Sequence, residues 1–469
     1  MSISVASCSL HELFFSEAII ASDASRIEGK LTIPEYQRPY RWQAEQIERL
    51  IQDYRYYLGE DSSSTTPSTC PFYLGSVILH QSAEHGQLNI IDGQQRLTTL
   101  ALMAFSQGHY KDVALQYNSP ESQRQIRKNL QWIKEHAGLL PEPLDFERIH
   151  FTLVVTQSED DAYRFFETQN TGGVRLSGPD IIKAHHLRAI DRLFQNLFAS
   201  KWEELGDLNP VVGALLKGRY WESINLREIP SHRQSQRIRS AVVKELAEDT
   251  NCGEDVSFGQ VTRIHQLDGG LHNQYAQQSY ALRQPLNTGV NTVHYLAYFE
   301  GLRVKYLVDG VPHITGFNTF YVELICLLEG CSYLKNLYDA CLLMYISQFG
   351  ETELEKAAHK LFRVIYSPRV SNQKAVRERS VSAFVRDYPV LDWIASTYTP
   401  QECFAYLDRF KLNVDPANLD KNSVKKRFIK AVCHYFNLSI KDARLADEFG
   451  PTLDQLIVRN QKLKELAHV

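Results

Sequence analysis

The sequence contains no closely spaced cysteine pair and no segment typical of export or membrane insertion. Its eight cysteines are scattered through 469 residues, and none occurs in a Cys-x-x-Cys pair. This spacing excludes a zinc ribbon and predicts reduced, mostly buried thiols. The first twenty residues carry Glu12 and Glu17 but no basic segment, so we expect no signal peptide. No apolar run is long enough to span a bilayer, so we expect a cytoplasmic protein without a membrane partner.

An excess of positive charge is also missing. Lysine and arginine total 51 against 55 aspartates and glutamates, which gives a formal net charge of −4. This balance provides no global attraction to nucleic acid, so any DNA contact would need a local basic patch. A content of 43% hydrophobic and 23% charged residues is typical of a globular protein, and the length allows roughly two or three domains.

The most informative stretch covers residues 90–100 and reads Ile-Ile-Asp-Gly-Gln-Gln-Arg-Leu-Thr-Thr-Leu. Two β-branched residues precede Asp-Gly, which is a turn signal. Leu97 and Leu100 then begin a series of apolar residues with helical spacing. The pattern predicts a buried strand, a tight turn and a helix.

This turn has the features of an anion site. Asp92 stands where an N-cap acceptor belongs, and Gly93 allows the backbone to approach a ligand closely. The amides of Gln94, Gln95 and Arg96 would lie at the helix N-terminus, where free N–H donors and the helix dipole favour an anion. Arg96 adds a guanidinium group suited to phosphate. The alternative is a capped helix with a solvated first turn, but the complete Asp-Gly-Gln-Gln-Arg pattern favours a phosphate or nucleotide site.

A second informative stretch covers residues 30–42. Two prolines remove backbone donors and favour extended geometry, so this segment is expected to be an edge strand or an ordered loop. It interleaves Tyr36, Tyr40 and Trp42 with polar residues, and such aromatic faces beside guanidinium groups suit a base and its phosphates. The alternative is an aromatic anchor on the core. We expect that anchoring role for Trp42 and a functional role for Gln37 and Arg38.

Periodicity and β-branched content predict the remaining elements. Residues 72–80, 88–91 and 149–156 are expected to be strands, and the chain is expected to be almost wholly helical from about residue 200. Helices are expected at residues 10–21, 47–54, 121–136, 160–169 and 179–198.

Two basic runs are weak candidates for DNA contact, because charge runs are usually solvated helix faces. One lies within residues 219–244 and the other within residues 421–430. The candidate DNA-binding residues are Arg219, Arg233, Arg237, Arg239, Lys425, Lys426 and Arg427.

Four sequence blocks occur in an order that resembles one protein family. They are Ile-Pro-Glu-Tyr-Gln-Arg-Pro-Tyr-Arg-Trp at 33–42, Tyr-Leu-Gly-Ser at 73–76, Ile-Asp-Gly-Gln-Gln-Arg-Leu-Thr-Thr-Leu at 91–100, and Phe-Phe-Glu-Thr-Gln-Asn-Thr-Gly-Gly at 165–173. The set resembles the N-terminal domain of GmrSD-type modification-dependent restriction enzymes, which also occurs in phosphorothioate-sensing SspE-like phage-defence proteins. This family is similar to the ParB/sulfiredoxin superfamily.

The resemblance implies an α+β fold, with a ParB-like nucleotide-binding domain at residues 1–190 and a mostly helical region at residues 191–469. It also implies binding and hydrolysis of a nucleoside triphosphate with Mg²⁺. Hydrolysis would be coupled to the sensing of modified or foreign DNA by a sensor or regulatory subunit that acts with a separate nuclease. The sequence leaves open whether the chain forms a homo-oligomer.

Residues from different blocks are expected to line one pocket. The expected catalytic residues are Asp92, Gln94, Gln95 and Arg96, with Asp92 also next to the metal ion, because a carboxylate beside a triphosphate needs a cation between them. The expected nucleotide-binding residues are Tyr36, Gln37, Arg38, Gly93, Arg96 and Asn170. Asn170 and Asp180 are implied only by the resemblance, and a helix-capping role explains them nearly as well.

The sequence departs from larger family members near its end. Many of these carry a C-terminal His-Asn-His nuclease domain, but the histidines after residue 300 do not form such a cluster. We therefore do not predict that this chain alone cuts DNA. Two alternatives stay open: a non-catalytic switch module that binds nucleotide or DNA, and an endonuclease that uses the ParB-like domain.

Overall fold

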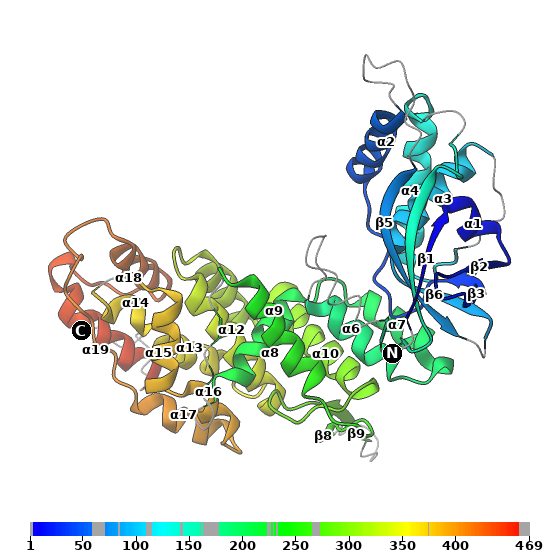
Figure 1. The fold of residues 1–469 in the computed structure, drawn as a ribbon. Coiled ribbons are helices and arrows are strands. Elements are labelled where there is room, and N and C mark those ends of the chain that lie inside the picture. Colours follow the sequence, from blue (N-terminus) through cyan, green and yellow to red (C-terminus); the bar gives the residue numbers. More distant parts are fainter. Residues whose placement is uncertain are drawn as a thin grey trace. The chain divides into compact units, whose positions relative to one another are not determined.

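The computed structural model divides the chain into two compact units. Unit 1 is Met1–Glu204 and unit 2 is Leu205–Val469 (Figure 1). The structure describes residues 3–58, 71–82, 85–108, 115–140, 144–159, 161–162, 178–222, 227, 229–230, 233–264, 273–373 and 375–458, with the backbone alone at 258–264 and 273–278.

Unit 1 combines a five-stranded sheet with helices. Its strands are β1 (Ile3–Ser9), β2 (Ala18–Ile20), β3 (Arg26–Glu28), β4 (Lys30–Thr32), β5 (Phe72–Ser82), β6 (Gln87–Asp92) and β7 (Ile149–Thr156). Its helices are α1 (Leu10–Phe15), α2 (Ala44–Leu58), α3 (Gln94–Ser106), α4 (Pro120–Glu135), the short η1 (Ala137–Leu139), α6 (Gly178–Arg188) and α7 (Arg192–Glu204). The sheet order is β1-β7-β5-β6-β4, and β2 and β3 form a separate ribbon.

Strand β5 is central because its sequence is apolar on both faces. Val77, Ile78 and Leu79 are fully buried, as expected for a strand covered on both sides. It runs parallel to β7 and antiparallel to β6. Strand β4 pairs with β6 at the edge of the sheet over three residues only, and Pro34 follows soon after, where it could not donate to a ladder.

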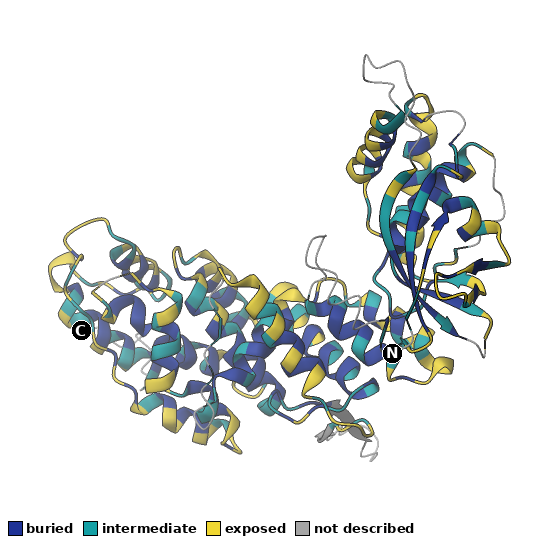
Figure 2. Cartoon of the chain, viewed as in Figure 1, coloured by how far each residue is buried: buried dark blue, intermediate teal, exposed yellow. Residues whose placement is uncertain are grey.

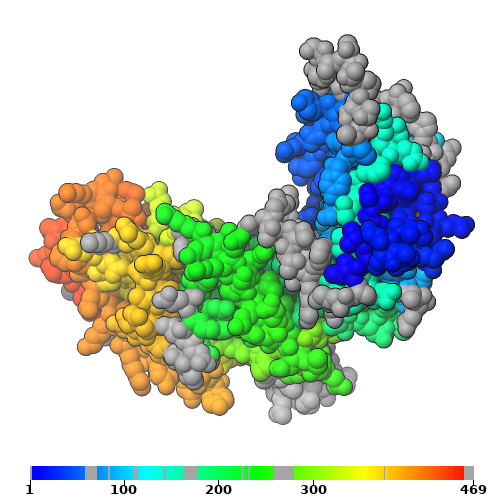
Figure 3. Space-filling view, viewed as in Figure 1, coloured from blue at the N-terminus to red at the C-terminus, as the bar shows by residue number. Residues whose placement is uncertain are grey.

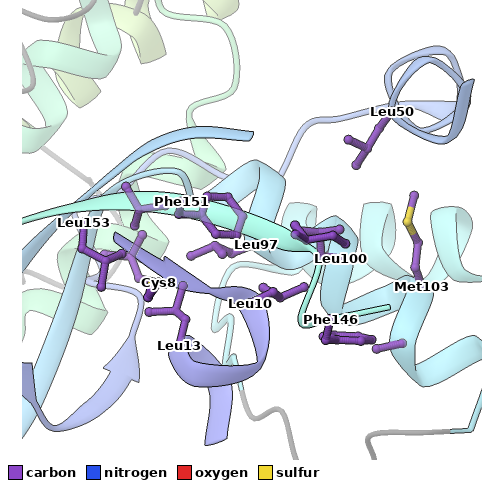
Figure 4. Close-up of a cluster of buried hydrophobic side chains, with 14 of the residues drawn as sticks. Cys8, Leu10, Leu13, Leu50, Leu97, Leu100, Met103, Phe146, Phe151 and Leu153 are labelled. Carbon is purple, nitrogen blue, oxygen red and sulfur yellow. The ribbon is translucent and has the colours of Figure 1, made fainter. Parts of the chain in front are cut away.

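One hydrophobic core lies between the sheet and helix α3. Figure 4 shows Leu97 and Leu100 of α3 beside Phe151 of β7, with Leu10 of α1 close by. Helix α2 adds one apolar stripe, as the spacing predicted. This packing fixes the start of α3 against the end of β6, which is the turn that the sequence singled out.

Unit 2 is almost entirely helical. It begins with α8 (Asn209–Tyr220), α9 (Ser235–Val243), η2 (Lys244–Glu248), the ribbon β8 (Phe258–Ile264) and β9 (Asn273–Ser279), α10 (Val290–Arg303), η3 (Val304–Val308), α11 (Thr315–Thr319), η4 (Phe320–Leu324) and η5 (Ile325–Leu327). It continues with α12 (Ser332–Phe349), α13 (Leu354–Ile365), α14 (Ser367–Ser371), α15 (Glu378–Asp387), α16 (Val390–Ala395), α17 (Pro400–Arg409), α18 (Val424–Tyr435), η6 (Asp442–Arg444) and α19 (Leu445–Val458).

Helix α12 forms the centre of unit 2. It is buried over most of its length and contacts α8, α10, α13 and α16, and exposed residues lie on the outer helices (Figure 2). In Figure 3 the colours of this unit run in order from green to red, so helices close in sequence are also close in space. Local contacts of this kind allow a helical unit to form without a long-range sheet.

The predicted fold class, an α+β N-terminal domain followed by a mostly helical region, is confirmed. The helix expected at 10–21 is wrong. Ser9 ends β1 and caps α1 with Glu12, and the chain then returns to strand β2. The helix expected at 179–198 is two helices, because the Asp191 side chain accepts from the amide of Leu193 and begins α7. Of the helix expected at 160–169, all but residues 161–162 lies outside the described residues.

Candidate functional site

The turn between β6 and α3 differs in one detail from the expectation. Asp92 is the last residue of β6, and Gly93 occupies the N-cap position with φ 97° and ψ −3°. The expectation that Asp92 caps the helix is therefore wrong, because Asp92 still pairs with Ile78 in the sheet. A Cβ atom on Gly93 would lie 2.9 Å from Val77 Cγ2, so the backbone approaches the core at this point.

Helix α3 begins without a side-chain cap. Its first residues, Gln94 and Gln95, are buried. A buried helix start leaves N–H groups that need a partner, which can be water or a ligand. The Gln94 carboxamide adds an unpaired acceptor, because its Oε1 atom is buried and has no hydrogen-bond partner among the described residues. The start of α3 therefore combines backbone donors that no side chain caps with an unpaired side-chain acceptor.

Gln95 fixes the segment that precedes α2. Its Oε1 atom accepts from the backbone amides of Arg41 at 2.9 Å and Trp42 at 3.2 Å, and its Nε2 atom donates to the Pro39 carbonyl at 3.0 Å. Both the oxygen and the nitrogen of this carboxamide are thus bound inside the fold. Gln94 uses only its amide nitrogen in this way, as a donor to the Arg38 carbonyl.

Arg96 binds the backbone of β5. Its Nη1 atom donates to the Leu74 carbonyl at 2.5 Å and its Nη2 atom to the Ser76 carbonyl at 2.6 Å. These carbonyls flank Gly75, where φ is +92° and the pairing of β5 with β7 shifts register. A Cβ atom on Gly75 would lie 2.8 Å from Arg96 Nη1, so the glycine leaves room for the guanidinium group. The sequence blocks at 73–76 and 91–100 therefore interlock.

Asp92 and Arg96 form a partly exposed ion pair. Asp92 Oδ2 lies 3.5 Å from Arg96 Nη2, and the two side chains are 32% and 23% exposed. The carboxylate therefore stays accessible to a cation. Within the part of the chain that the structure describes, no cluster of three His, Cys, Asp or Glu side chains could hold a metal ion. A Mg²⁺ ion at Asp92 would need phosphate oxygens and water as further ligands, which is common for Mg²⁺.

The aromatic residues of the 33–42 segment face the interior. Tyr36 is 3% exposed and its hydroxyl donates to Glu159. Tyr40 is fully buried, and its hydroxyl bonds with Thr99 and accepts from Asn129. Trp42 packs against the core, as its expected anchoring role requires. The described geometry thus gives both tyrosines a packing role, so stacking of either ring on a base would require them to move.

Arg38 and Gln37 line a small pocket of about 20 Å³ within unit 1. Its walls include the 33–39 segment, Tyr117 and Asn118 before α4, and Lys183 of α6. The Arg38 guanidinium group is half-buried and has no ion pair among the described residues. Asp92, Gln94, Gln95 and Arg96 do not belong to the lining of this pocket. The two blocks meet instead through Gln94 and Gln95, and through the bond from Gln37 Nε2 to the Ile91 carbonyl.

Sequence reasoning missed a buried ion pair beside this pocket. Lys183 Nζ binds Glu203 Oε1 at 2.5 Å and the Gln37 carbonyl at 3.0 Å, and the two side chains are 3% and 9% exposed. Burial raises the pKa of the nearby Glu35 carboxyl, although Asn118 donates to it. One signal was present in the sequence: Lys183 stands among Ile181, Ile182 and Ala184, so a helix that is buried nearly all round must bury the lysine too.

The candidate DNA-binding residues fall into two groups, those held in ion pairs inside unit 2 and those nearer its surface. Two of them carry structural ion pairs: Arg219 binds Glu245 and the carbonyls of Leu282 and Gln284, and Lys425 binds Asp415. These two charges are engaged within unit 2. The others lie nearer the surface: Arg427 pairs with Glu329 and Lys426 with Asp442, and Arg233, Arg237 and Arg239 lie in or beside α9.

Asn170, which was expected to bind nucleotide, lies outside the described residues. Asp180 is at the start of α6, and its Oδ1 atom lies 3.8 Å from Arg41 Nη1. Among the described residues, no helix combines the length and apolar character needed to cross a bilayer.

Comparison with known proteins divides the chain into two regions. Residues 194–423 match a family of unknown function (DUF7834). No curated protein matches the chain. Residues 20–187 match the GmrSD restriction endonuclease, N-terminal domain, and this range contains all four sequence blocks. The resemblance drawn from those blocks is confirmed: the N-terminal part of this chain is similar to the N-terminal domain of GmrSD restriction endonucleases.

Proposed function

We propose that this chain is a component of a restriction or phage-defence system that binds and hydrolyses a nucleoside triphosphate at the start of α3. The family match over residues 20–187 supports the restriction theme. The observation that carries the nucleotide site is the start of α3, which is buried and has no side-chain cap. A phosphate group would accept from the free amides and interact favourably with the helix dipole.

The charges near this helix start suit a triphosphate with its magnesium ion. Asp92 offers a partly exposed carboxylate to Mg²⁺, and Arg96 is held beside it by two backbone carbonyls. A guanidinium group that is fixed before the substrate arrives needs little reorganisation to offset charge in the transition state. Magnesium would supply charge neutralisation on the phosphates, which is a main element of catalysis in phosphoryl transfer.

The geometry distinguishes the two glutamines. The hydrogen bonds that orient the Gln95 carboxamide all join it to the backbone of residues 39–42. Gln94 keeps a buried, unpaired Oε1 atom. We therefore assign Gln94 as the residue that orients the attacking water, and Gln95 as a residue that positions the neighbouring segment.

The test is phosphate release from the full chain with Mg²⁺ and each of the four nucleoside triphosphates. Arg96→Ala should lose hydrolysis and most nucleotide affinity, whereas Asp92→Ala should lose hydrolysis and keep much of its binding. Gln94→Ala should lower the rate by about 10-fold to 100-fold at nearly unchanged affinity, as for loss of one positioned polar group. Gln52→Ala, at an exposed position on α2, is the matched control.

Two results would reject the assignment. If Asp92→Ala, Arg96→Ala and Gln94→Ala all hydrolyse nucleotide like the parent protein, the start of α3 is only structural. If the parent protein binds nucleotide but releases no phosphate, the chain is a switch module rather than a hydrolase. Folding of each variant is checked by circular dichroism, because Arg96 also binds β5.

We also propose that modified or foreign DNA is the effector and that a separate nuclease cuts it. The exposed cations Arg237 on α9 and Arg427 and Lys430 on α18 are the contacts to test first. Their combined replacement by alanine should weaken DNA binding and reduce its salt dependence, since fewer counterions are released. An unchanged salt dependence would assign these residues to solvated surface. Cleavage of modified DNA by the pure chain with Mg²⁺ would show that it needs no partner nuclease.

A further inference from the structure

Unit 2 contains a second polar pocket, which the proposed nucleotide site does not use. It lies between α8, α10 with its continuation η3, η4 and α12, and α8, α10 and α12 pack against one another (Figure 1). Its volume is about 280 Å³, close to the lower end of the range for small-molecule sites. Three cationic side chains line it: Lys217 from α8, Arg303 from α10 and Lys335 from α12.

Two of these cations have carboxylate partners. Lys335 Nζ donates to Asp339 Oδ2 at 2.7 Å and to the Tyr321 hydroxyl at 2.6 Å, and that hydroxyl donates to Asp339 Oδ1 at 2.9 Å. Arg303 binds Glu300 through Nε at 2.8 Å and Nη2 at 2.7 Å. These contacts hold both cations in place at the pocket wall and offset the charge of both carboxylates.

Lys217 is different. Its Nζ atom donates to the Gly213 carbonyl of its own helix at 3.1 Å, and no carboxylate pairs with it among the described residues. Burial lowers the pKa of its ammonium group. The carboxylates of Asp339 and Glu378 attract this ammonium group at longer range, and an anion bound directly to it in the pocket would offset more of the cost of its burial. The pocket thus has one positive charge without a direct ion pair among the described residues, and further donors around it.

We propose that this pocket binds the phosphate group of a small phosphorylated molecule, with Lys217 as its counter-charge. A tetrahedral phosphate presents several oxygens, and donors approach this pocket from three helices. Lys217 offers its remaining ammonium protons, and Arg303 has an Nη1 group that Glu300 does not bind. Asn336 adds an amide group to the lining. Lysine is a common point-charge partner of phosphate. Asp339 does not prevent binding, because Lys335 and Tyr321 already hold its carboxylate.

The test uses isothermal titration of the full chain with inorganic phosphate and, separately, with adenosine monophosphate. Lys217→Met removes the charge and keeps the length of the side chain. It should weaken binding of the probe at least tenfold, while the thermal midpoint without probe stays equal or rises. Lys441→Met, an exposed lysine of the same unit that is not part of the lining, is the control and should bind like the parent.

The two probes separate the sources of the phosphate group. Binding of inorganic phosphate that is lost in Lys217→Met supports the site with free phosphate as ligand. Binding of the nucleotide alone, with the same loss, supports the site with a nucleotide as ligand. The proposal fails if neither probe binds, or if Lys217→Met binds like the parent. It also fails if Arg96→Ala removes the binding and Lys217→Met does not, because the phosphate would then lie at the start of α3. Since the two variants lie in different units, this result is independent of whether the chain hydrolyses nucleotides.

Discussion

The start of α3 and the pocket between α8, α10 and α12 use polar side chains in opposite ways. At the start of α3, Gln95 and Arg96 bind backbone groups of their neighbours, no side chain caps the helix amides, and Gln94 Oε1 is unpaired. In the helical pocket, the unpaired group is the charged end of Lys217. The first region therefore offers neutral donors fixed by the backbone, whereas the second offers a formal charge at the end of a long side chain.

This difference explains why one region has a sequence motif and the other does not. A turn that holds two strands, a helix and the segment 38–42 together must place its residues within a few positions, and Asp-Gly-Gln-Gln-Arg does so at 92–96. The helical pocket takes its cations from residues 217, 303 and 335, which no short pattern connects. A recognisable motif can therefore mark a structural junction as much as a binding site.

The largest expected effect is the loss of stability on replacing Gln95, and it measures how much the Asp-Gly-Gln-Gln-Arg motif contributes to folding. Gln95→Ala leaves the amides of Arg41 and Trp42 and the Pro39 carbonyl without their side-chain partner. Each buried group left unpaired costs about 1–3 kcal/mol, so we expect a loss of at least about 3 kcal/mol in the free energy of unfolding. Urea denaturation followed by tryptophan fluorescence measures it, with Gln52→Ala as control. A loss below about 1 kcal/mol would show that Gln95 contributes little to the stability of the fold.

A second prediction concerns an unpaired polar group in unit 2. His359 Nε2 is buried without a hydrogen-bond partner among the described residues, beside the rings of Phe320 and Phe436. Burial lowers the pKa of this imidazole from 6.5 to about 4. The neutral form is therefore favoured in the folded state, and the stability from this group is present above pH 6.5.

This stability should be lost as the pH falls from about 6.5 to about 4, by roughly 3 kcal/mol, because each pKa unit corresponds to about 1.4 kcal/mol. Thermal unfolding across that range measures the slope. His359→Phe should flatten it, whereas His434→Gln, at an exposed position of α18, should leave it unchanged. If the His359→Phe profile matches that of the parent, other groups cause the acid sensitivity.

A third prediction separates backbone strain from close packing at the two ends of α3. Gly93 and Gly108 both have positive φ, at 97° and 73°, but only Gly93 lies close to a side chain, Val77. Gly108→Ala should cost about 1 kcal/mol through backbone strain. Gly93→Ala should cost about 1–3 kcal/mol more, because Val77 must move. Denaturant midpoints compare the variants, and equal losses would show that Val77 moves without cost.

The smallest effect concerns the basic run at 421–430. Arg427 and Glu329 form a surface pair whose side chains are 44% and 72% exposed. Arg427→Ala should therefore change the free energy of unfolding by less than about 1 kcal/mol. Lys425, whose side chain is 7% exposed and pairs with Asp415, should be clearly more sensitive to alanine in the same thermal assay. Similar losses of stability for both variants would mean that burial does not determine how much each basic residue of this run contributes to folding.

The fold followed from the sequence where periodicity was strong. Strands β5 and β7 and helices α2 and α4 agree closely with the expected ranges, because apolar and β-branched spacing decided them. Strand β1 was missed, since Ser, Ala and Cys alternate there without a strongly apolar pattern and its pairing with β7 spans most of unit 1.

The candidate site was less accessible to sequence reasoning. Spacing placed Asp92, Gln94, Gln95 and Arg96 at one turn, but it could not show that Gln95 and Arg96 bind backbone carbonyls and amides. Side-chain hydrogen bonds to the backbone depend on which segment lies opposite, and the partners of Gln95 are more than fifty positions away in the chain. The nucleotide and metal roles of these residues stay predictions.

The Lys183–Glu203 contact sets the smallest fragment of unit 1 that should be stable alone. A fragment that ends at residue 190 would keep Lys183 in its buried position and lose Glu203 with the rest of α7. Removal of one partner from a buried ion pair typically costs about 3–5 kcal/mol. Fragments for crystallisation or binding studies should therefore extend through Glu204, and expression of soluble protein should fall sharply when the end point moves to the N-terminal side of α7.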